Sequence, residues 1–486
     1  MYADSKQNES REQSVIEQLE NPSASDGNIL FSAIAIDPKL ERRITRKIDF
    51  RLIPILAAIY TFALIDRTNI GAARISGIDA ALDLKVGNRV SIAILVFYIG
   101  YIVFELPSNI ILKKLGPATW LSFLTIAWGA IVIGMGYVPT WKAFAMLRVM
   151  LGILEAGLYP GCIYLIASWY KRYEVQKRIA VFFMTASFLS SLSNILAYGL
   201  IQIADNPSTG GWKWIFVVEG AITVGIGILA FVVVVDFPES KRNKFLSAEE
   251  KAVLRARLQA ERGSVEGEQV NWKVIAETVK DWQVWGSAVM YMSASVGIYS
   301  FLIFLPVILR AGLGFSLKLS FLLSAPPAAF SVIFALVISW LADKYQVRGP
   351  FVFGQAVLTI IGLAMIGFIK HPIPRYLGAF LGQAGSNALV ITCLTWGQNN
   401  IRSDAKRSVT TAIQVMMASI GGIYSALVFR QQDAPNYIPG IIATGSVMLL
   451  TAILAPTMSI LLRRANAQAD AGHRILEGSP AFRYTW

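Results

Sequence analysis

Charged residues, histidine and cysteine are all scarce in this chain of 486 residues. Asp, Glu, Lys and Arg make up 15% of it, whereas a soluble domain carries about 25%. The only cysteines, Cys162 and Cys393, lie inside apolar stretches, and they do not make a disulfide framework. The only histidines are His371, in a predicted outer loop, and His473, near the carboxyl terminus. So little histidine argues against a membrane enzyme.

Several motifs are missing as well. The sequence has no Walker A phosphate loop, so we do not expect the chain itself to use the energy of ATP hydrolysis. It has no zincin, nucleophile-elbow or dinucleotide motif in a suitable context, so we expect no enzyme activity, no metal and no organic cofactor. No cleavable signal peptide is visible, and the polar first forty residues predict a disordered tail.

Long hydrophobic runs are what the chain has in abundance, since 55% of its residues are hydrophobic. Twelve stretches are each near the length of about 20 residues that crosses a bilayer. They are approximately 51–70, 90–112, 118–138, 142–166, 179–203 and 213–235, then, after a charged break, 284–309, 320–341, 351–369, 374–397, 408–429 and 438–462. This layout predicts an all-α membrane protein with twelve transmembrane helices in two six-helix halves.

The formal net charge of +13 resides mostly in the short connections between spans. Basic residues in such connections set the topology and contact anionic lipid, so we do not expect nucleic-acid binding. The connections on the side of both termini carry most of the Lys and Arg residues. The positive-inside rule therefore predicts that both termini are cytoplasmic, and an even number of spans agrees with termini on the same side.

This topology divides the chain into five parts. We expect a cytoplasmic tail (1–48), a first bundle (49–236), a central cytoplasmic loop (237–281), a second bundle (282–463) and a second tail (464–486). In the central loop, Ser247 and Glu250 predict a capping box for a short polar helix through Leu258. The stretch from Trp272 to Trp282 is amphipathic; it either lies on the membrane surface or forms a plain cytosolic linker.

The two halves carry related turns. Residues 108–117 follow the second span and residues 339–349 follow the eighth, and both stretches are tight, basic and rich in small residues. Two six-span halves around an axis along the membrane normal are a transporter architecture. Such halves can rock about a central site that opens to each side in turn.

These turns resemble the loop signature of the major facilitator superfamily. The second copy matches better, and the resemblance implies a gating role for Asp343, Lys344 and Arg348. The first copy has Leu112 where the family usually places an acidic residue.

A narrower resemblance covers nearly the whole chain. It rests on residues 66–74, 104–109, 148–161, 169–172, 211–220 and 236–239. In this order they resemble the anion:cation symporter family, in particular its fungal allantoate and nicotinate permease branch. The resemblance implies proton-coupled uptake of a small organic anion, such as nicotinate, pantothenate, biotin, allantoate, a sugar acid or a short dicarboxylate. The coupling ions it implies are protons, and we further expect a plasma-membrane protein that acts as a monomer.

Arg67, which ends the first span, is the best candidate for the anion anchor. Charges within a bilayer usually face a cavity or a partner, and a guanidinium presents a planar donor fork that matches a carboxylate. Two alternatives stay open. Arg67 either neutralises Asp66 or Glu155 in a fixed network, or it extends to the outer interface.

The proton-coupling candidates are also in the first half. Arg148 and Glu155 are seven residues apart and so share a helix face, and Tyr159 follows one turn later. Burial disfavours a charged carboxylate, which suits Glu155 to take up and release a proton, and Asp66 is the second candidate. In the alternative interpretation, Arg148 has no direct role in coupling and pairs with the backbone or with Asp66.

Glu105 is a further candidate proton site, although it could equally be a structural acid. The remaining substrate candidates are polar or aromatic residues within spans: Asn69, Tyr159, Asn194, Tyr299, Trp396, Asn399 and Gln414. Amides orient a substrate and aromatic walls stack on a flat ring, but each residue could instead make an interhelical contact. An exporter, a uniporter and a transporter-like sensor remain alternative functions.

Overall fold

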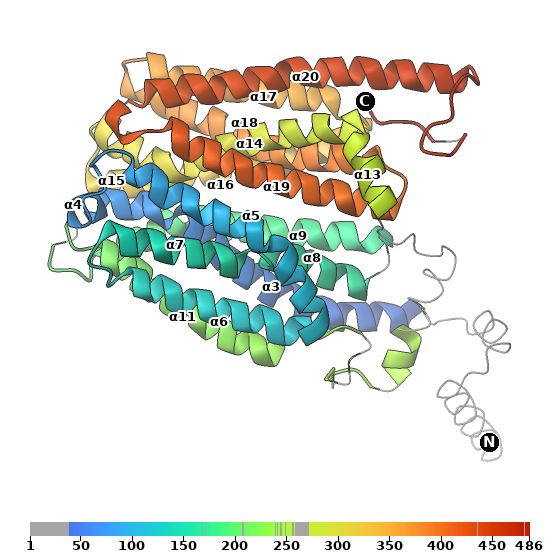
Figure 1. Ribbon diagram of the computed structural model, residues 1–486, viewed down its shortest axis with the longest axis horizontal. Coiled ribbons are helices and arrows are strands. Elements are labelled where there is room, and N and C mark those ends of the chain that lie inside the picture. Colours follow the sequence, from blue (N-terminus) through green and yellow to red (C-terminus); the bar gives the residue numbers. More distant parts are fainter. Residues whose placement is uncertain are drawn as a thin grey trace.

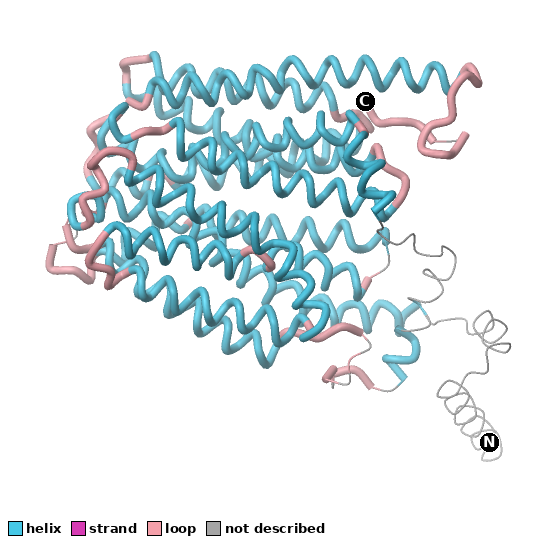
Figure 2. Tube along the Cα trace, in the orientation of Figure 1, coloured by secondary structure: helices cyan, strands magenta, loops and turns pink. Residues whose placement is uncertain are grey.

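The computed structural model describes residues 38–170, 172–206, 209–238, 240, 242–243, 245–247, 249–254, 257, 272–434, 436–480 and 482–486. In these residues the chain is helical apart from turns and one isolated bridge between Leu476 and Ser479. Figures 1 and 2 show long helices running side by side in one bundle. The predicted disordered tail lies outside the described residues.

The first half is built from α3 (Pro38–Ile75), α5 (Arg89–Leu115), α6 (Pro117–Met135), the pair α7 (Trp141–Glu155) and α8 (Leu158–Trp169), the pair α9 (Arg172–Ser191) and α10 (Ser193–Ile201), and α11 (Trp212–Val233). A short helix, α4 (Ile78–Ala81), follows α3. Buried apolar residues from these helices form one large core.

The second half has the same number of spans. It comprises α14 (Trp282–Val307) with a π turn at Ile308–Gly312, the pair α15 (Leu317–Leu322) and α16 (Ala325–Tyr345), α17 (Gly349–Phe368), α18 (Pro372–Asn399), α19 (Asp404–Val428) and α20 (Ile438–Asp470). In Figure 1, α3 begins and α20 ends at the same, right-hand end of the bundle.

The predicted fold class is confirmed. Eleven helical spans in the described residues are long and apolar enough to cross a membrane. The remaining predicted span coincides with α5, whose 27 residues make a helix about 40 Å long at 1.5 Å per residue. Two helices run further than expected: α3 already begins at Pro38, within the stretch assigned to the first tail, and α20 continues past residue 463 to Asp470.

Three spans are interrupted where the sequence analysis expected continuous helices. The fourth breaks after Glu155, because Pro160 in α8 has no N–H for the carbonyl of Ala156. The eighth breaks before Ala325, where Pro326 and Pro327 likewise withhold two donors. The fifth breaks at Leu192, which separates α9 from α10.

The two halves meet through close backbone contacts. Helix α3 packs on α14 and α5 packs on α19. A Cβ atom at Gly71 would lie 2.4 Å from the carbonyl oxygen of Ile303, and one at Gly422 would lie 2.4 Å from the ring of Tyr98. Both glycines therefore permit an approach that any side chain would obstruct.

A polar seal joins the halves at the end away from the start of α3. The Arg74 guanidinium donates to the Tyr437 hydroxyl across the interface at 3.2 Å and to Asp79 at 3.3 Å. It also lies over the ring of Phe304, 5.7 Å from the centroid. The halves are thus closed against each other at this end.

The central loop is tied to the first half. The predicted capping box is confirmed, since Ser247 N–H donates to Glu250 at 3.0 Å and Glu250 N–H donates to the Ser247 hydroxyl at 3.1 Å. Lys47 of α3 forms an ion pair with Glu250. Residue 258, the predicted end of this helix, lies outside the described residues. The predicted amphipathic segment forms α13 (Trp272–Lys280), which packs on α19.

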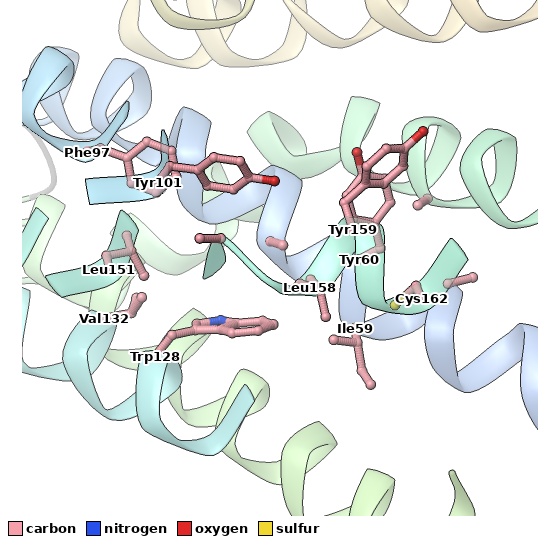
Figure 3. Packing of buried hydrophobic residues seen from close by; sticks show 14 of the residues in the cluster. Ile59, Tyr60, Phe97, Tyr101, Trp128, Val132, Leu151, Leu158, Tyr159 and Cys162 are labelled. Carbon is pink, nitrogen blue, oxygen red and sulfur yellow. The ribbon is translucent and has the colours of Figure 1, made fainter. Parts of the chain in front are cut away.

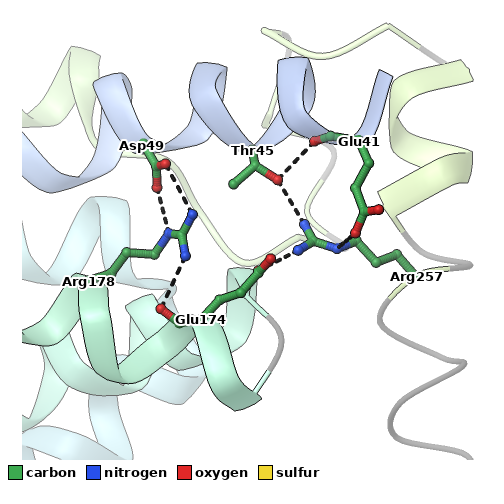
Figure 4. Close-up of polar contacts among 6 residues, drawn as sticks. All are labelled: Glu41, Thr45, Asp49, Glu174, Arg178 and Arg257. Atoms are coloured by element: carbon green, nitrogen blue, oxygen red, sulfur yellow. Dashed lines mark hydrogen bonds and ion pairs between the residues drawn. The ribbon is translucent and has the colours of Figure 1, made fainter. Parts of the chain in front are cut away.

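Arg257 connects the loop to two helices (Figure 4). Its guanidinium forms ion pairs with Glu41 at 2.8 Å and with Glu174, and it donates to the Thr45 hydroxyl at 3.0 Å. Next to it, Arg178 pairs with Asp49 at 2.7 Å. The loop therefore holds the amino-terminal ends of α3 and α9 together.

Candidate functional site

A buried ion pair lies at the centre of the first half. The Nε of Arg67 on α3 donates to Oε2 of Glu155, the last residue of α7, at 2.8 Å. The Glu155 side chain has no exposed surface and that of Arg67 is 9% exposed. The structure thus brings together the predicted anion anchor and the predicted coupling acid.

Aromatic rings enclose this pair. The Arg67 guanidinium lies 4.8 Å from the ring centroid of Tyr101 and 5.5 Å from that of Phe97, which favours the cation. In Figure 3 the hydroxyl of Tyr101 points toward the overlapping rings of Tyr60 and Tyr159, whose centroids are 5.2 Å apart. The walls are therefore flat and largely apolar.

The second half reaches the site through Tyr299 of α14. Its ring meets that of Tyr98 on α5 edge to face, with centroids 5.2 Å apart, and its hydroxyl lies within electrostatic reach of Arg67. A site built by both halves is rearranged when the halves move relative to each other.

The ion pair does not use all of its hydrogen-bonding capacity. Nη2 of Arg67, Oε1 of Glu155 and Oδ2 of Asp66 are buried and have no partner in the described residues. Unpaired buried groups of this kind are costly. The free Nη2 is a donor suited to a carboxylate oxygen.

Arg148 serves the backbone around the site. It is 1% exposed, and it donates to the carbonyl of Ala93 at 3.3 Å and to that of Asp66 at 3.2 Å. Its guanidinium also lies 5.1 Å from the centre of the Phe97 ring. Arg148 therefore ties α7 to α3 and α5, which is the backbone-pairing alternative of the sequence analysis.

Tyr159, Glu105 and Asp66 do not take part in the Arg67–Glu155 ion pair. The break after Glu155 places Tyr159 on α8, where it packs on Tyr60 and Phe183, so a single continuous helix face does not link Glu155 to Tyr159. Glu105 is half-buried one turn beyond Tyr101, within electrostatic reach of Arg67. Asn69 donates to Asp66 at 3.3 Å.

Three candidates of the second half lie elsewhere. Gln414 donates to the Ser287 hydroxyl at 3.3 Å and accepts from Gln398, so it links helices. Trp396 is buried and donates to the carbonyl of Thr485 at 2.8 Å, against the carboxy-terminal segment. Asn399 is exposed at the end of α18. Helix spacing alone could not place these residues along the bundle.

Asn194 borders a small cavity between the halves. Its other lining residues include Thr68, Phe301 and Gln383, from α3, α14 and α18. The cavity has about 10 Å³ of water-accessible volume, which is room for about one water. It is lined by Thr68 but not by Arg67 or Glu155, so it is a separate cavity between the two halves.

The three gating candidates share one turn. Asp343 and Arg348 form an ion pair between α16 and α17, and the Arg348 N–H donates to the Trp486 carbonyl at 3.0 Å. Lys344 lies over the ring of Trp340. The turn and the carboxy-terminal segment thus form one contact surface.

The sequence analysis missed three aromatic residues around the ion pair, Tyr60, Phe97 and Tyr101, and the buried acid Glu219 on α11. Glu219 gave a clear signal, since it is the only charged residue in the apolar run of α11 after Lys213, and an intramembrane charge is a functional hypothesis. The aromatic residues gave none, because rings are common in any apolar helix.

Comparisons with known proteins agree with this architecture. Residues 56–426 match the family model of the major facilitator superfamily. The chain is 31% identical over 464 residues to an uncharacterized transporter of Schizosaccharomyces pombe, covering 92% of this chain and 90% of the relative. It is 26% identical to the high-affinity nicotinic acid transporter of Saccharomyces cerevisiae, covering 92% and 85%.

A solved structure has the same fold. The xylose transporter XylE from E. coli, in a partially occluded inward-open conformation, aligns with a TM-score of 0.66 at 16% identity, covering 84% of this chain and 97% of that one. The fold and the matches define a multi-pass membrane protein that is a secondary transporter and not an enzyme. The chain belongs to the major facilitator superfamily, and within it to a fungal permease-like branch.

Proposed function

We propose that this transporter imports a small organic carboxylate together with protons. The observation that carries the proposal is the buried Arg67–Glu155 pair with its unpaired donor Nη2. A guanidinium in such a place binds a carboxylate in two-point geometry. The likeness to a nicotinic acid transporter supports a flat, monoanionic substrate, because the walls around Arg67 are rings.

Competition for Arg67 provides the coupling step. The substrate carboxylate accepts from Nη2 and Nε of Arg67 and displaces Glu155 from its 2.8 Å contact. Glu155 is then a buried carboxylate without its cation, a state that burial disfavours, so it takes up a proton from the side facing the substrate. Release of substrate and proton on the other side restores the pair.

The same proposal includes the cellular setting. The protein resides in the plasma membrane as a monomer with both termini in the cytoplasm, and its coupling ion is the proton. The excess of Lys and Arg in the connections on the side of the termini supports this orientation. Closure by Arg74 and Tyr437 then lies at the outer end.

A competition assay tests the substrate class. Cells expressing the protein take up radiolabelled nicotinate or another small carboxylate from a panel, in the presence of unlabelled acids and their neutral amides. The acids should compete and the amides should compete poorly, because an amide leaves Arg67 without an anion in an apolar site. Equal competition by an acid and its amide would show that charge is not what the site selects.

A further inference from the structure

A second acidic group lies deep in the first half, apart from the Arg67–Glu155 pair. Glu219 sits in the middle of α11 and has no exposed surface. Both of its carboxylate oxygens are buried without a hydrogen-bond partner in the described residues. An ionised carboxylate in that position would be very unfavourable.

Asp66 of α3 is a titratable group that interacts electrostatically with Glu219, and α3 packs on α11. Asp66 is 2% exposed, and its Oδ2 also lacks a partner. Asn69, one turn later on α3, lies beside Glu219 and donates to Oδ1 of Asp66 at 3.3 Å. Two carboxyl groups, three of whose oxygens lack a hydrogen-bond partner in the described residues, therefore lie on the packed helices α3 and α11 with Asn69 next to both.

In the described residues, no Lys or Arg side chain of a neighbouring helix forms an ion pair with Glu219 or Asp66. Helices α6 and α10, which pack on α11, carry no charged residue. From α6, Trp128 lies near Asp66, and its indole N–H has no acceptor. Arg148 of α7 donates to the backbone carbonyl of Asp66, and Arg67 pairs with Glu155.

Two neighbouring carboxyl groups in an apolar interior cannot both be ionised. If one proton resides on the pair, it supplies a hydroxyl donor for one of the empty acceptors and leaves one negative charge in place of two. The remaining charge faces the Asn69 amide, the Trp128 indole and, at longer range, Arg148. One proton thus resolves most of the unpaired atoms of the cluster.

We infer that Glu219 and Asp66 form a second proton site, which loads and releases its proton during the transport cycle. This inference rests on the proposed function and deepens it. Asp66 precedes Arg67 in the chain and also interacts with Glu155, so movement of Arg67 or protonation of Glu155 changes the field at the pair. With two protons for each monoanion, one net positive charge enters with each substrate, and uptake becomes sensitive to the membrane potential.

Proteoliposomes that hold the purified protein test the inference. A potassium gradient with valinomycin sets the membrane potential, a buffer gradient sets the pH difference, and labelled substrate and charge movement are measured together. Wild-type protein should move about one elementary charge per substrate, whereas one proton per monoanion would move none. Glu219→Gln keeps the shape but cannot release a proton, so its uptake should follow the pH gradient alone and ignore the potential.

Controls separate the possible failures. Glu219→Asp should restore part of the voltage response, and Glu249→Gln, on an exposed loop residue, should behave as wild type. Substrate exchange by Glu219→Gln shows that the variant is folded. The inference is overturned if Glu219→Gln moves the same charge per substrate as wild type, or if wild type moves none.

Infrared spectroscopy provides a readout that does not depend on transport. The wild type should show a carboxylic-acid carbonyl band that Glu219→Gln loses and Glu249→Gln keeps. If wild type fails to accumulate any carboxylate with a pH gradient, the proposed function fails, while the band still reports on the proton site. An unchanged band in Glu219→Gln would overturn the site itself.

Discussion

At the scale of single residues, the site depends on where one guanidinium directs its donors. Arg67 uses Nε for Glu155 and leaves Nη2 unpaired. The sequence predicted Arg67, Asp66, Glu155 and Arg148 as a polar group, because charges within apolar spans are conspicuous. It could not predict which acid pairs with which arginine, since this depends on how α3 and α7 cross.

Arg67→Ala should abolish substrate binding, and Arg67→Lys should restore little of it, because an ammonium lacks the planar fork. Losing one partner of a desolvated charge pair costs about 2–5 kcal/mol, which is a large loss of affinity. Calorimetry on purified protein measures it. Binding by Arg67→Ala at near wild-type affinity would remove Arg67 from the account.

Glu155→Gln should separate coupling from exchange. The amide keeps the shape of the protonated acid but cannot release a proton, so pH-driven accumulation should disappear. Exchange of internal for external substrate requires no net proton release and should persist. Proteoliposomes loaded with unlabelled substrate report both; if Glu155→Gln concentrates substrate like wild type, another acid carries this proton.

At the scale of elements, the sequence predicted the spans well and their interruptions poorly. Apolar length identifies a helix that crosses a bilayer, but the effect of Pro160, Pro326 and Pro327 was not anticipated. Each withholds a donor from a carbonyl four residues earlier, and the breaks follow at those carbonyls. The break after Glu155 matters because it ends α7 at the acid that we propose to carry the coupled proton.

The contact between α3 and α14 should depend on Gly71. A Cβ atom there would lie 2.4 Å from the Ile303 carbonyl oxygen, so Gly71→Ala should push the halves apart near the Arg74–Tyr437 contact and lower the uptake rate severalfold. Gly225→Ala is the matched control, because that site on α11 has open space for a Cβ. Equal uptake by the two variants would show that the close contact is not needed for closure.

The central loop should detach at acid pH. Although burial opposes ionisation, Lys47 and the Ser247 backbone lower the pKa of Glu250 below its ordinary value. A lowered pKa contributes stability above the ordinary value of about 4.3, and this contribution is lost as the pH falls through the lowered pKa. Hydrogen exchange should show faster exchange of residues 245–254 below about pH 4, and Glu250→Gln should show it at neutral pH. Protection that is independent of pH in both proteins would contradict this.

At the scale of the whole molecule, two six-helix halves enclose a charged centre that only one of them provides. The first half holds Arg67, Arg148, the buried acids Asp66, Glu155 and Glu219 and the half-buried Glu105, whereas the second half approaches with rings such as Tyr299. The sequence showed this asymmetry clearly. It did not show the depth of each polar residue, and so Trp396, Asn399 and Gln414 were grouped with residues that the fold keeps apart.

Accumulation driven by a pH gradient tests the central claim most directly. Proteoliposomes with an acidic exterior and a neutral interior receive labelled nicotinate or the best carboxylate from the panel. Wild-type protein should raise the internal concentration above the external one, and a proton carrier that collapses the gradient should reduce it to equality. Uptake that stops at equal concentrations with the gradient intact would contradict proton-coupled transport by this protein.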